Sequence, residues 1–224
     1  MRFRDRRHAG RELAERLLQS PGLRRSADPI VLALPRGGVP VAVEVARALG
    51  APLDVLVVHK IGAPGQPEAG IGAVVGDDPP VFDRRVLKIL GITADRPAGD
   101  LARERAELHR REDLYRQGRP PPRLAGRTVV LVDDGLATGV TARAALRRVR
   151  GERPARLILA VPVCDARSAG ELRDDVDELV CLSAHRYLHA IGPWYEDFRQ
   201  VPDHEVTDAL RSLHAVDRAA RQQA

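Results

Sequence analysis

The sequence predicts an α/β fold in which a mostly parallel sheet is covered by helices on both faces. Short, nearly continuous apolar runs, such as Ile30–Leu34 and Thr128–Val132, alternate along the chain with segments of helical periodicity. Such runs are typical of strands buried on both faces, and their alternation with helices indicates βαβ units. The 224 residues suffice for one sizeable domain of this class.

The elements of the first half follow from apolar periodicity and from Gly and Pro stop signals. The first helix ends at Ser20-Pro21-Gly22, and Gly50 closes the second. A Gly- and Pro-rich stretch, Ile61–Gly70, is expected to be a loop. In chain order we predict a helix at Arg11–Leu18, a strand at Ile30–Leu34, a helix at Val41–Leu49, and strands at Leu53–Val58 and Ile71–Val75.

The second half begins with a densely charged segment, Asp95–Arg119. We predict a largely exposed helix there, because Glu107 and Arg111 form a favourable i,i+4 pair. This helix belongs to a helical insertion at about residues 76–125. The elements that follow are a strand at Thr128–Val132, a helix at Thr141–Arg150, a strand at Leu157–Val163, a helix at Ala166–Arg173, a strand at Glu178–Leu182 and a helix at Asp203–Val216.

The C-terminal part differs in composition from the rest of the chain. Residues 183–202 are irregular and hold four of the seven aromatic residues, namely Tyr187, Trp194, Tyr195 and Phe198. We therefore predict a core at residues 1–182, and a small hood with the last helix at residues 183–224.

Composition limits the classes of function. The net charge of +5 suits an anionic partner, but it does not choose between phosphates, nucleic acid and a membrane surface. No apolar run approaches the ~18 residues of a membrane span, and no apolar region follows the basic N-terminus as in a secretory signal. Cys164 and Cys181 cannot build a disulfide framework. We expect a cytoplasmic protein without a membrane partner.

The strongest chemical signal is Val129–Ala142, which reads VVLVDDGLATGVTA. An apolar strand is followed by two carboxylates, Asp133 and Asp134, and then by a Gly/Thr turn that opens a helix. Ligands of open α/β sheets bind at the carboxyl ends of strands, and backbone N–H groups at such a turn form a phosphate cradle. The adjacent carboxylates can accept hydrogen bonds from a ribose diol, so the pattern indicates a sugar phosphate. An ordinary strand–turn–helix with Asp at the turn is the alternative.

At these residues the sequence resembles the type I phosphoribosyltransferases, whose motif is an apolar strand, two acids and a T-G-x-T loop. The resemblance implies a parallel five-stranded core with a hood, and phosphoribosyl pyrophosphate as substrate. It also implies that Asp133 and Asp134 hold the ribose hydroxyls. The 5-phosphate would be bound by Gly135, Leu136, Ala137, Thr138, Gly139, Val140 and Thr141.

A second segment, Leu34–Pro40 (LPRGGVP), also lies between an apolar strand and a helix. Arg36 can make bidentate contacts to phosphate oxygens, while Gly37 and Gly38 allow close approach of the backbone. In the resembled family this position is the pyrophosphate loop, although Pro-x-Gly-Gly is also a common turn. Lys60, one of only two lysines, follows the second strand and is a further expected pyrophosphate contact; a solvated loop lysine is the alternative.

The resemblance extends over most of the chain, to a bacterial and archaeal subgroup of uncharacterised phosphoribosyltransferases. It is carried by RFRDRRHAGRELA (Arg2–Ala14), LPRGGVPVA, KIGAPGQPEAGIGAV (Lys60–Val74) and IGPWYEDFRQV (Ile191–Val201). The family's catalytic loop has no alignable counterpart, although Arg84, Arg85 and Lys88 offer charges that could close over pyrophosphate. No general base is assigned, so a loss of catalysis stays open.

The expected reaction displaces pyrophosphate from phosphoribosyl pyrophosphate by a nitrogen nucleophile of a base. Arg36, Lys60, Asp133 and Asp134 would be its catalytic residues, and Mg²⁺ would be held through substrate oxygens, with no protein ligand set of its own. A homodimer is possible. The rival hypothesis is a non-catalytic regulator that binds phosphoribosyl pyrophosphate or a nucleotide and acts on nucleic acid. Interleaved charges make a nucleic-acid partner the less favoured one.

The hood is expected to choose the acceptor. A flat heterocycle needs an apolar face, and the aromatic rings of Trp194 and Tyr195 could provide it. Sealing of the hood against the sheet is the alternative role for these rings.

Overall fold

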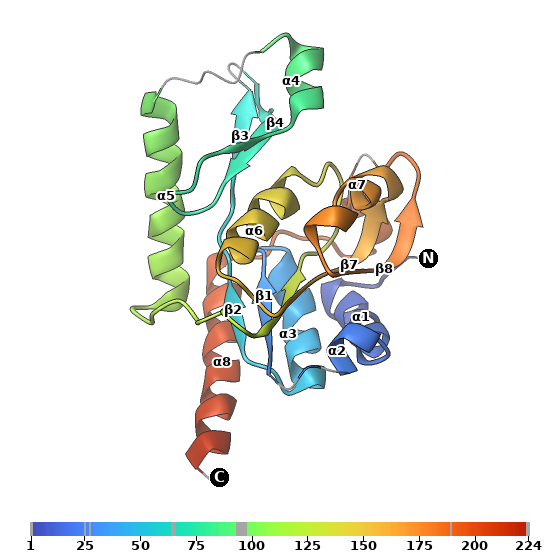
Figure 1. Ribbon diagram of the computed structural model, residues 1–224, viewed down its shortest axis with the longest axis vertical. Coiled ribbons are helices and arrows are strands. Elements are labelled where there is room, and N and C mark those ends of the chain that lie inside the picture. The colour runs from blue at the N-terminus through green and yellow to red at the C-terminus, as the bar shows by residue number, and fades with distance from the viewer. Residues whose placement is uncertain are drawn as a thin grey trace.

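The computed structural model describes residues 2–24, 26, 28–63, 66–92, 98–188 and 190–222. Its centre is a parallel sheet of five strands in the order β2-β1-β6-β7-β8 (Figure 1). This confirms the predicted parallel core. The strands are β1 (Pro29–Ala33), β2 (Leu53–Val55), β6 (Thr128–Val132), β7 (Arg156–Asp165) and β8 (Glu178–His185).

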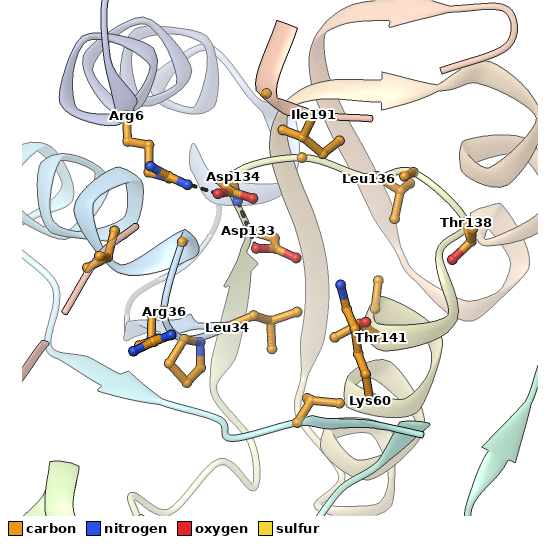
Figure 2. A pocket seen from close by; sticks show the side chains of 18 of the residues that line it. Arg6, Leu34, Arg36, Lys60, Asp133, Asp134, Leu136, Thr138, Thr141 and Ile191 are labelled. Carbon is orange, nitrogen blue, oxygen red and sulfur yellow. Dashed lines mark hydrogen bonds and ion pairs between the residues drawn. The ribbon is translucent and has the colours of Figure 1, made fainter. Parts of the chain in front are cut away.

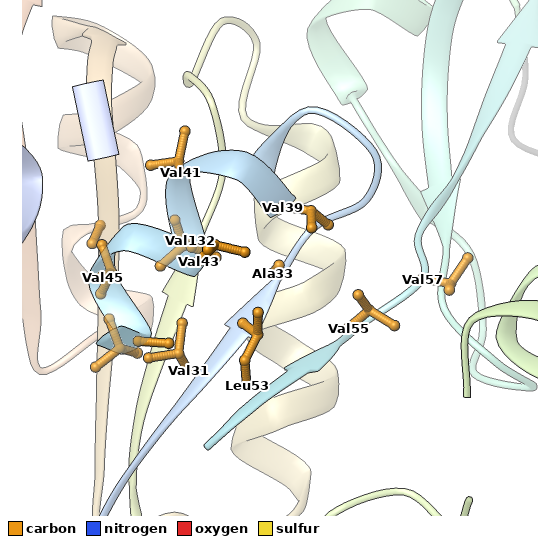
Figure 3. Close-up of a cluster of buried hydrophobic side chains, with 14 of the residues drawn as sticks. Val31, Ala33, Val39, Val41, Val43, Val45, Leu53, Val55, Val57 and Val132 are labelled. Carbon is orange, nitrogen blue, oxygen red and sulfur yellow. The ribbon is translucent and has the colours of Figure 1, made fainter. Parts of the chain in front are cut away.

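Helices cover both faces of this sheet, because alternate strand residues point to opposite sides. Val31, Ala33 and Val132 face one cluster, in which valines of the helix after β1 pack on β1, β2 and β6 (Figure 3). Ile30 and Leu131 face the other cluster. The first face is covered by α1 (Arg6–Leu18), α3 (Gly38–Leu49) and α8 (Asp203–Gln222), with the short α2 (Pro21–Arg24) beside them, and the second by α6 (Val140–Gly151) and α7 (Ala166–Glu171). The helix α5 (Ala98–Arg116) packs on α8 and on a strand outside this sheet.

A second, smaller sheet corrects two predictions. Its antiparallel strands are β3 (His59–Ala63), β4 (Gln66–Val74) and β5 (Val81–Phe82). The stretch predicted as a loop, Ile61–Gly70, is therefore mostly hairpin strand, apart from residues 64–65, which lie outside the described residues. Its glycines accompany shifts of register between β3 and β4 rather than a break in pairing. The predicted strand Ile71–Val75 belongs to this sheet and not to the parallel one.

Other boundaries differ by a few residues. The first helix begins earlier than predicted, at Arg6, because Asp5 caps it by accepting a hydrogen bond from the His8 N–H at 2.7 Å. The predicted insertion holds β5, α4 (Arg84–Leu90) and α5. The helix expected after β7 is split into α7 and a 3₁₀ turn, η1 (Arg173–Asp175).

The hood, here residues 186–202, is tied to the N-terminus. The Phe3 N–H donates to the Trp194 carbonyl, and the Glu196 N–H donates to the Phe3 carbonyl, both at 2.8 Å. A 3₁₀ turn, η2 (Gly192–Trp194), precedes this pairing. The last helix, α8, packs on α3, α5 and β2 instead of continuing the hood. In the described part of the chain no helix combines the length and the apolar character that crossing a membrane requires.

Candidate functional site

A cavity of about 770 Å³ opens at the carboxyl ends of β1 and β6 (Figure 2). This is the edge at which open α/β sheets bind ligands. Loops after both strands, the start of β3 and the hood all contribute to its walls. Its lining includes Arg36, Gly37, Lys60, Asp133, Asp134, Gly135, Leu136, Ala137, Thr138, Gly139 and Thr141.

The two carboxylates directly follow β6 and are held in place by hydrogen bonds. Arg6 donates from Nε to Asp134 Oδ2 at 2.8 Å, and both side chains are nearly buried, at 10% and 14% exposure. The Asp134 N–H donates to Asp133 Oδ1 at 2.8 Å, and the Tyr195 hydroxyl donates to the Asp134 carbonyl at 2.7 Å. The pair is thus preorganised before any ligand arrives.

Burial dominates the electrostatics of this pair. It raises the pKa of Asp133 well above its usual value, and the negative charge of Asp134 raises that pKa further. Burial also raises the pKa of Asp134, while the nearby Arg6 guanidinium opposes the rise. Burial makes the ionised forms of these two carboxylates unfavourable. A ligand that brings positive charge or hydrogen-bond donors would stabilise the ionised forms, so the pair is suited to bind such a ligand.

The phosphate loop, residues 135–141, runs from the acid pair to the start of α6. It is fixed to β7, because the Leu136 N–H donates to the Val163 carbonyl at 2.9 Å and its carbonyl accepts from the Asp165 N–H at 2.7 Å. A Cβ at Gly135 would lie 2.6 Å from Ile191 Cδ1 of the hood, so only glycine allows this approach. Thr138 and Thr141 are presented on the loop and at the first turn of α6 (Figure 2).

The loop after β1 meets the acid pair closely. A Cβ at Gly37 would overlap Asp134 Oδ2, so the backbone approaches the carboxylate as only glycine permits. Arg36 Nη1 lies 3.7 Å from Asp203 Oδ1 at the start of α8. The Tyr115 hydroxyl of α5 also donates to Asp203 Oδ1, at 2.5 Å. Two helices distant in sequence therefore position the predicted pyrophosphate arginine.

Lys60 extends from β3 into the cavity, with its amine end between Asp133 and Thr141 in Figure 2. Its positive charge partly offsets the burial that raises the pKa of Asp133. The neighbouring His59 also lines the cavity, and its Nε2 lies 2.5 Å from Glu104 Oε2 of α5. The hairpin thus adds a cation to the same space as the carboxylates.

The structure brings most, but not all, of the predicted residues together. Gly38 and Val140, the first residues of α3 and α6, are not among the residues that line this cavity. Trp194 and Tyr195 are also outside that lining. The Trp194 ring stacks on His185 with centroids 3.7 Å apart, and Tyr195 is 2% exposed between other rings. In the structure, both rings pack the hood.

Several lining residues were not predicted from the sequence. Arg6 lies 128 positions from its partner Asp134, so no local pattern connects them. Its only signal was its place in the N-terminal segment that carries the family resemblance. The other unpredicted lining residues include His59, Arg111, Ile191, Phe198 and Val201.

Comparisons with known proteins agree with this geometry. The phosphoribosyl transferase domain profile matches residues 5–196. Proposed phosphoribosyl transferases of two Mycobacterium tuberculosis strains, CDC 1551 and H37Rv, are each 42% identical over 97% of this chain. The chain spans about half the length of these curated relatives, since it covers 50% of each. The crystal structure of TT1426 from Thermus thermophilus is 44% identical, covers 94% of this chain and 98% of its own, and superposes with a TM-score of 0.73.

Proposed function

Because the chain belongs to the phosphoribosyl transferase domain family, we propose that its cavity binds phosphoribosyl pyrophosphate and transfers the phosphoribosyl group to a nitrogenous base. One observation carries the proposal. The acid pair, the phosphate loop, Arg36 and Lys60 come from three separate segments of the sequence, yet they line a single cavity.

Different residues contact different parts of the substrate. The phosphate loop offers backbone N–H groups and the hydroxyls of Thr138 and Thr141 to the 5-phosphate. Asp133 and Asp134 accept hydrogen bonds from the ribose hydroxyls. Arg36 and Lys60 stabilise the charge that develops on the leaving pyrophosphate. The bond from C1 to the pyrophosphate oxygen breaks, while a bond from C1 to the base nitrogen forms.

Magnesium fits this donor set. Mg²⁺ prefers oxygen ligands and keeps several waters and substrate phosphates in its coordination shell. The Asp133 and Asp134 carboxylates present oxygens at the cavity, and burial raises the pKa of each, so a nearby cation would favour their ionised forms. Bound through the substrate, Mg²⁺ would neutralise charge on the pyrophosphate.

The acceptor would lie against the apolar part of the cavity. Ile191, Phe198 and Val201 line that part. The Arg6 guanidinium lies over the Phe198 ring, with its Cζ 3.8 Å from the ring centroid. Stacking of the acceptor on Trp194 would require the ring to leave His185. We therefore place the acceptor beside Ile191 and Val201, and leave the identity of the base open to experiment.

The decisive experiment incubates the protein with phosphoribosyl pyrophosphate, Mg²⁺ and a panel of purine, pyrimidine and related bases, and follows pyrophosphate release. One base should support release well above the rate without a base. Thr141→Ala should weaken phosphoribosyl pyrophosphate binding by about 1–3 kcal/mol, as for a lost hydrogen bond to a charged group. Asp133→Asn and Asp134→Asn should impair both binding and release.

Tight binding without release for any base would instead favour the non-catalytic regulator. No binding of phosphoribosyl pyrophosphate would contradict the proposed transfer and would leave only a regulator that binds a nucleotide.

A further inference from the structure

A second cavity, of about 690 Å³, lies between the small sheet and the helices α6 and α7. Thr138 of the phosphate loop lines both cavities, but the remaining residues of the second are its own. Its charged lining residues are Asp83, Arg84, Arg85, Arg143, Arg147 and Glu171.

Four arginines face this cavity against two carboxylates. Asp83 caps the start of α4, because its Oδ1 accepts hydrogen bonds from the backbone N–H groups of Arg85 and Val86 at 2.9 and 3.1 Å. Glu171 forms ion pairs with Arg143, whose Nη2 lies 3.2 Å from Glu171 Oε2, and with an arginine of α7. Both acids are therefore already engaged.

The remaining arginines have no such partners. On α6, Arg148 pairs with Glu152 at 2.7 Å and Arg150 with Asp177 at 3.0 Å, whereas Arg147, which faces the cavity, has no ion pair or side-chain hydrogen bond within the described part of the chain. The same holds, among those residues, for Arg84 and Arg85. One cavity is therefore lined by three guanidinium groups that form no ion pair with a carboxylate of the described residues, an arrangement that suits a multiply charged anion.

The other lining residues narrow the class of anion. Val81, Phe82, Leu87 and Val140 place apolar and aromatic surface in the same cavity as the arginines. A volume near 690 Å³ also exceeds the needs of a bare phosphate and is typical of sites for organic ligands. We propose that this second cavity binds a nucleoside phosphate, with its phosphates on Arg84, Arg85 and Arg147 and its base on the apolar side chains. The site adjoins the one proposed for phosphoribosyl pyrophosphate and shares Thr138 with it, while its arginines line the second cavity alone.

The test measures binding of ATP and of GTP to the full chain by calorimetry, without added metal. Arg147→Gln and Arg84→Gln should each weaken the binding of the nucleotide about tenfold, as expected for a lost charge-assisted hydrogen bond. Arg147→Lys should recover part of the affinity because it restores the charge. Adenosine and guanosine should bind at least tenfold more weakly than their triphosphates.

Two matched controls distinguish this site from binding elsewhere on the chain. Lys60→Gln removes a cation from the first cavity alone, and Arg16→Gln removes an exposed arginine that lines neither cavity. Both should leave nucleotide affinity unchanged, and melting curves should show that every variant is folded. The proposal fails if neither nucleotide binds at millimolar concentration. It also fails if Lys60→Gln weakens binding while the cavity variants do not, or if Arg16→Gln weakens it equally.

Discussion

The Asp133 carboxyl lies in a buried environment that makes its ionised form unfavourable. Burial first, and then the charge of Asp134, raise its pKa well above the usual value. A carboxyl whose pKa is higher in the folded state binds its proton more tightly there, so the folded state loses stability as pH rises from the ordinary value through the raised one. Because Asp133 lowers the stability of the folded state above its ordinary pKa, its presence is best explained by a role in binding a ligand.

Asp133→Asn should therefore stabilise the protein while impairing the proposed function. The amide removes a buried negative charge, and its oxygen can still accept the hydrogen bond from the Asp134 N–H. The melting temperature should rise by about 2–4 °C for each kcal/mol gained. Calorimetric scans between pH 5 and 8 should show the largest gain at high pH and a shrinking gain on acidification. A variant less stable than the native chain at pH 8 would refute this explanation of the carboxyl.

Gly37 provides a second test at single-residue scale. Gly37→Ala forces Asp134 away from the position in which it meets Arg6, because the new Cβ would overlap Asp134 Oδ2. Binding of phosphoribosyl pyrophosphate should weaken at least tenfold. The control is Gly151→Ala, at the end of α6, where no atom lies within 4 Å of an added Cβ. It should leave binding unchanged; equal losses in both variants would show a general effect of alanine.

At the scale of single residues, the sequence predicts those site residues that lie together in one contiguous motif. Asp133, Asp134 and the phosphate loop are contiguous, so their chemistry can be recognised without coordinates. Arg6 and Ile191 reach the same cavity only because the chain folds back, and no local spacing contains that information.

Among the elements, strands with apolar continuity and helices with Gly or Pro ends were predictable from local physics. The hairpin of β3 and β4 was not, because its Gly- and Pro-rich sequence is also that of a loop. What makes it a hairpin is cross-strand pairing, as between Lys60 and Ala73, and the outer strand β5. Such pairing joins residues of different elements, which local periodicity does not connect.

The pairing of the N-terminal segment with the hood yields a prediction at the level of elements. Phe3 is 1% exposed, and its ring lies 5.5 Å from that of Tyr195. Phe3→Ala should reduce the free energy of unfolding by about 3–5 kcal/mol, the usual loss for a buried phenylalanine. Leu18→Ala, at a residue that is 48% exposed, should cost far less. Denaturant unfolding measures both, and similar small losses would contradict the close packing of the hood.

Over the whole molecule, the class of fold was easier to predict from the sequence than its division into sheets. The five parallel strands followed from apolar runs and from the family resemblance, and the structure confirms them. The small antiparallel sheet was missed, since its residues were predicted as a loop, as a strand without an antiparallel partner, or as part of the insertion. Its position beyond the parallel sheet is evident only in three dimensions (Figure 1).

The two sheets should differ in local stability. The β6 and β7 residues are almost all buried and lie inside the parallel sheet, whereas the small sheet has only three strands among the described residues. Amide hydrogen exchange should therefore be slowest in Thr128–Val132 and in the middle of β7, and distinctly faster in His59–Ala63. Mass spectrometry of deuterated peptides resolves these segments. Equal protection would mean that the molecule opens only as one unit.

The contacts of Arg6 have a consequence for how the protein is made. Its guanidinium donates both to Asp134 and to the Arg199 carbonyl, so the cavity uses the first turn of α1 and a segment of the hood that is synthesised 193 residues later. A ribosome makes the chain from the N-terminus, and this wall cannot close until the hood has left the exit tunnel. The parallel sheet can therefore form on the ribosome while the cavity is still open. A nascent chain would acquire its ligand only after the segment around Arg199 has left the tunnel.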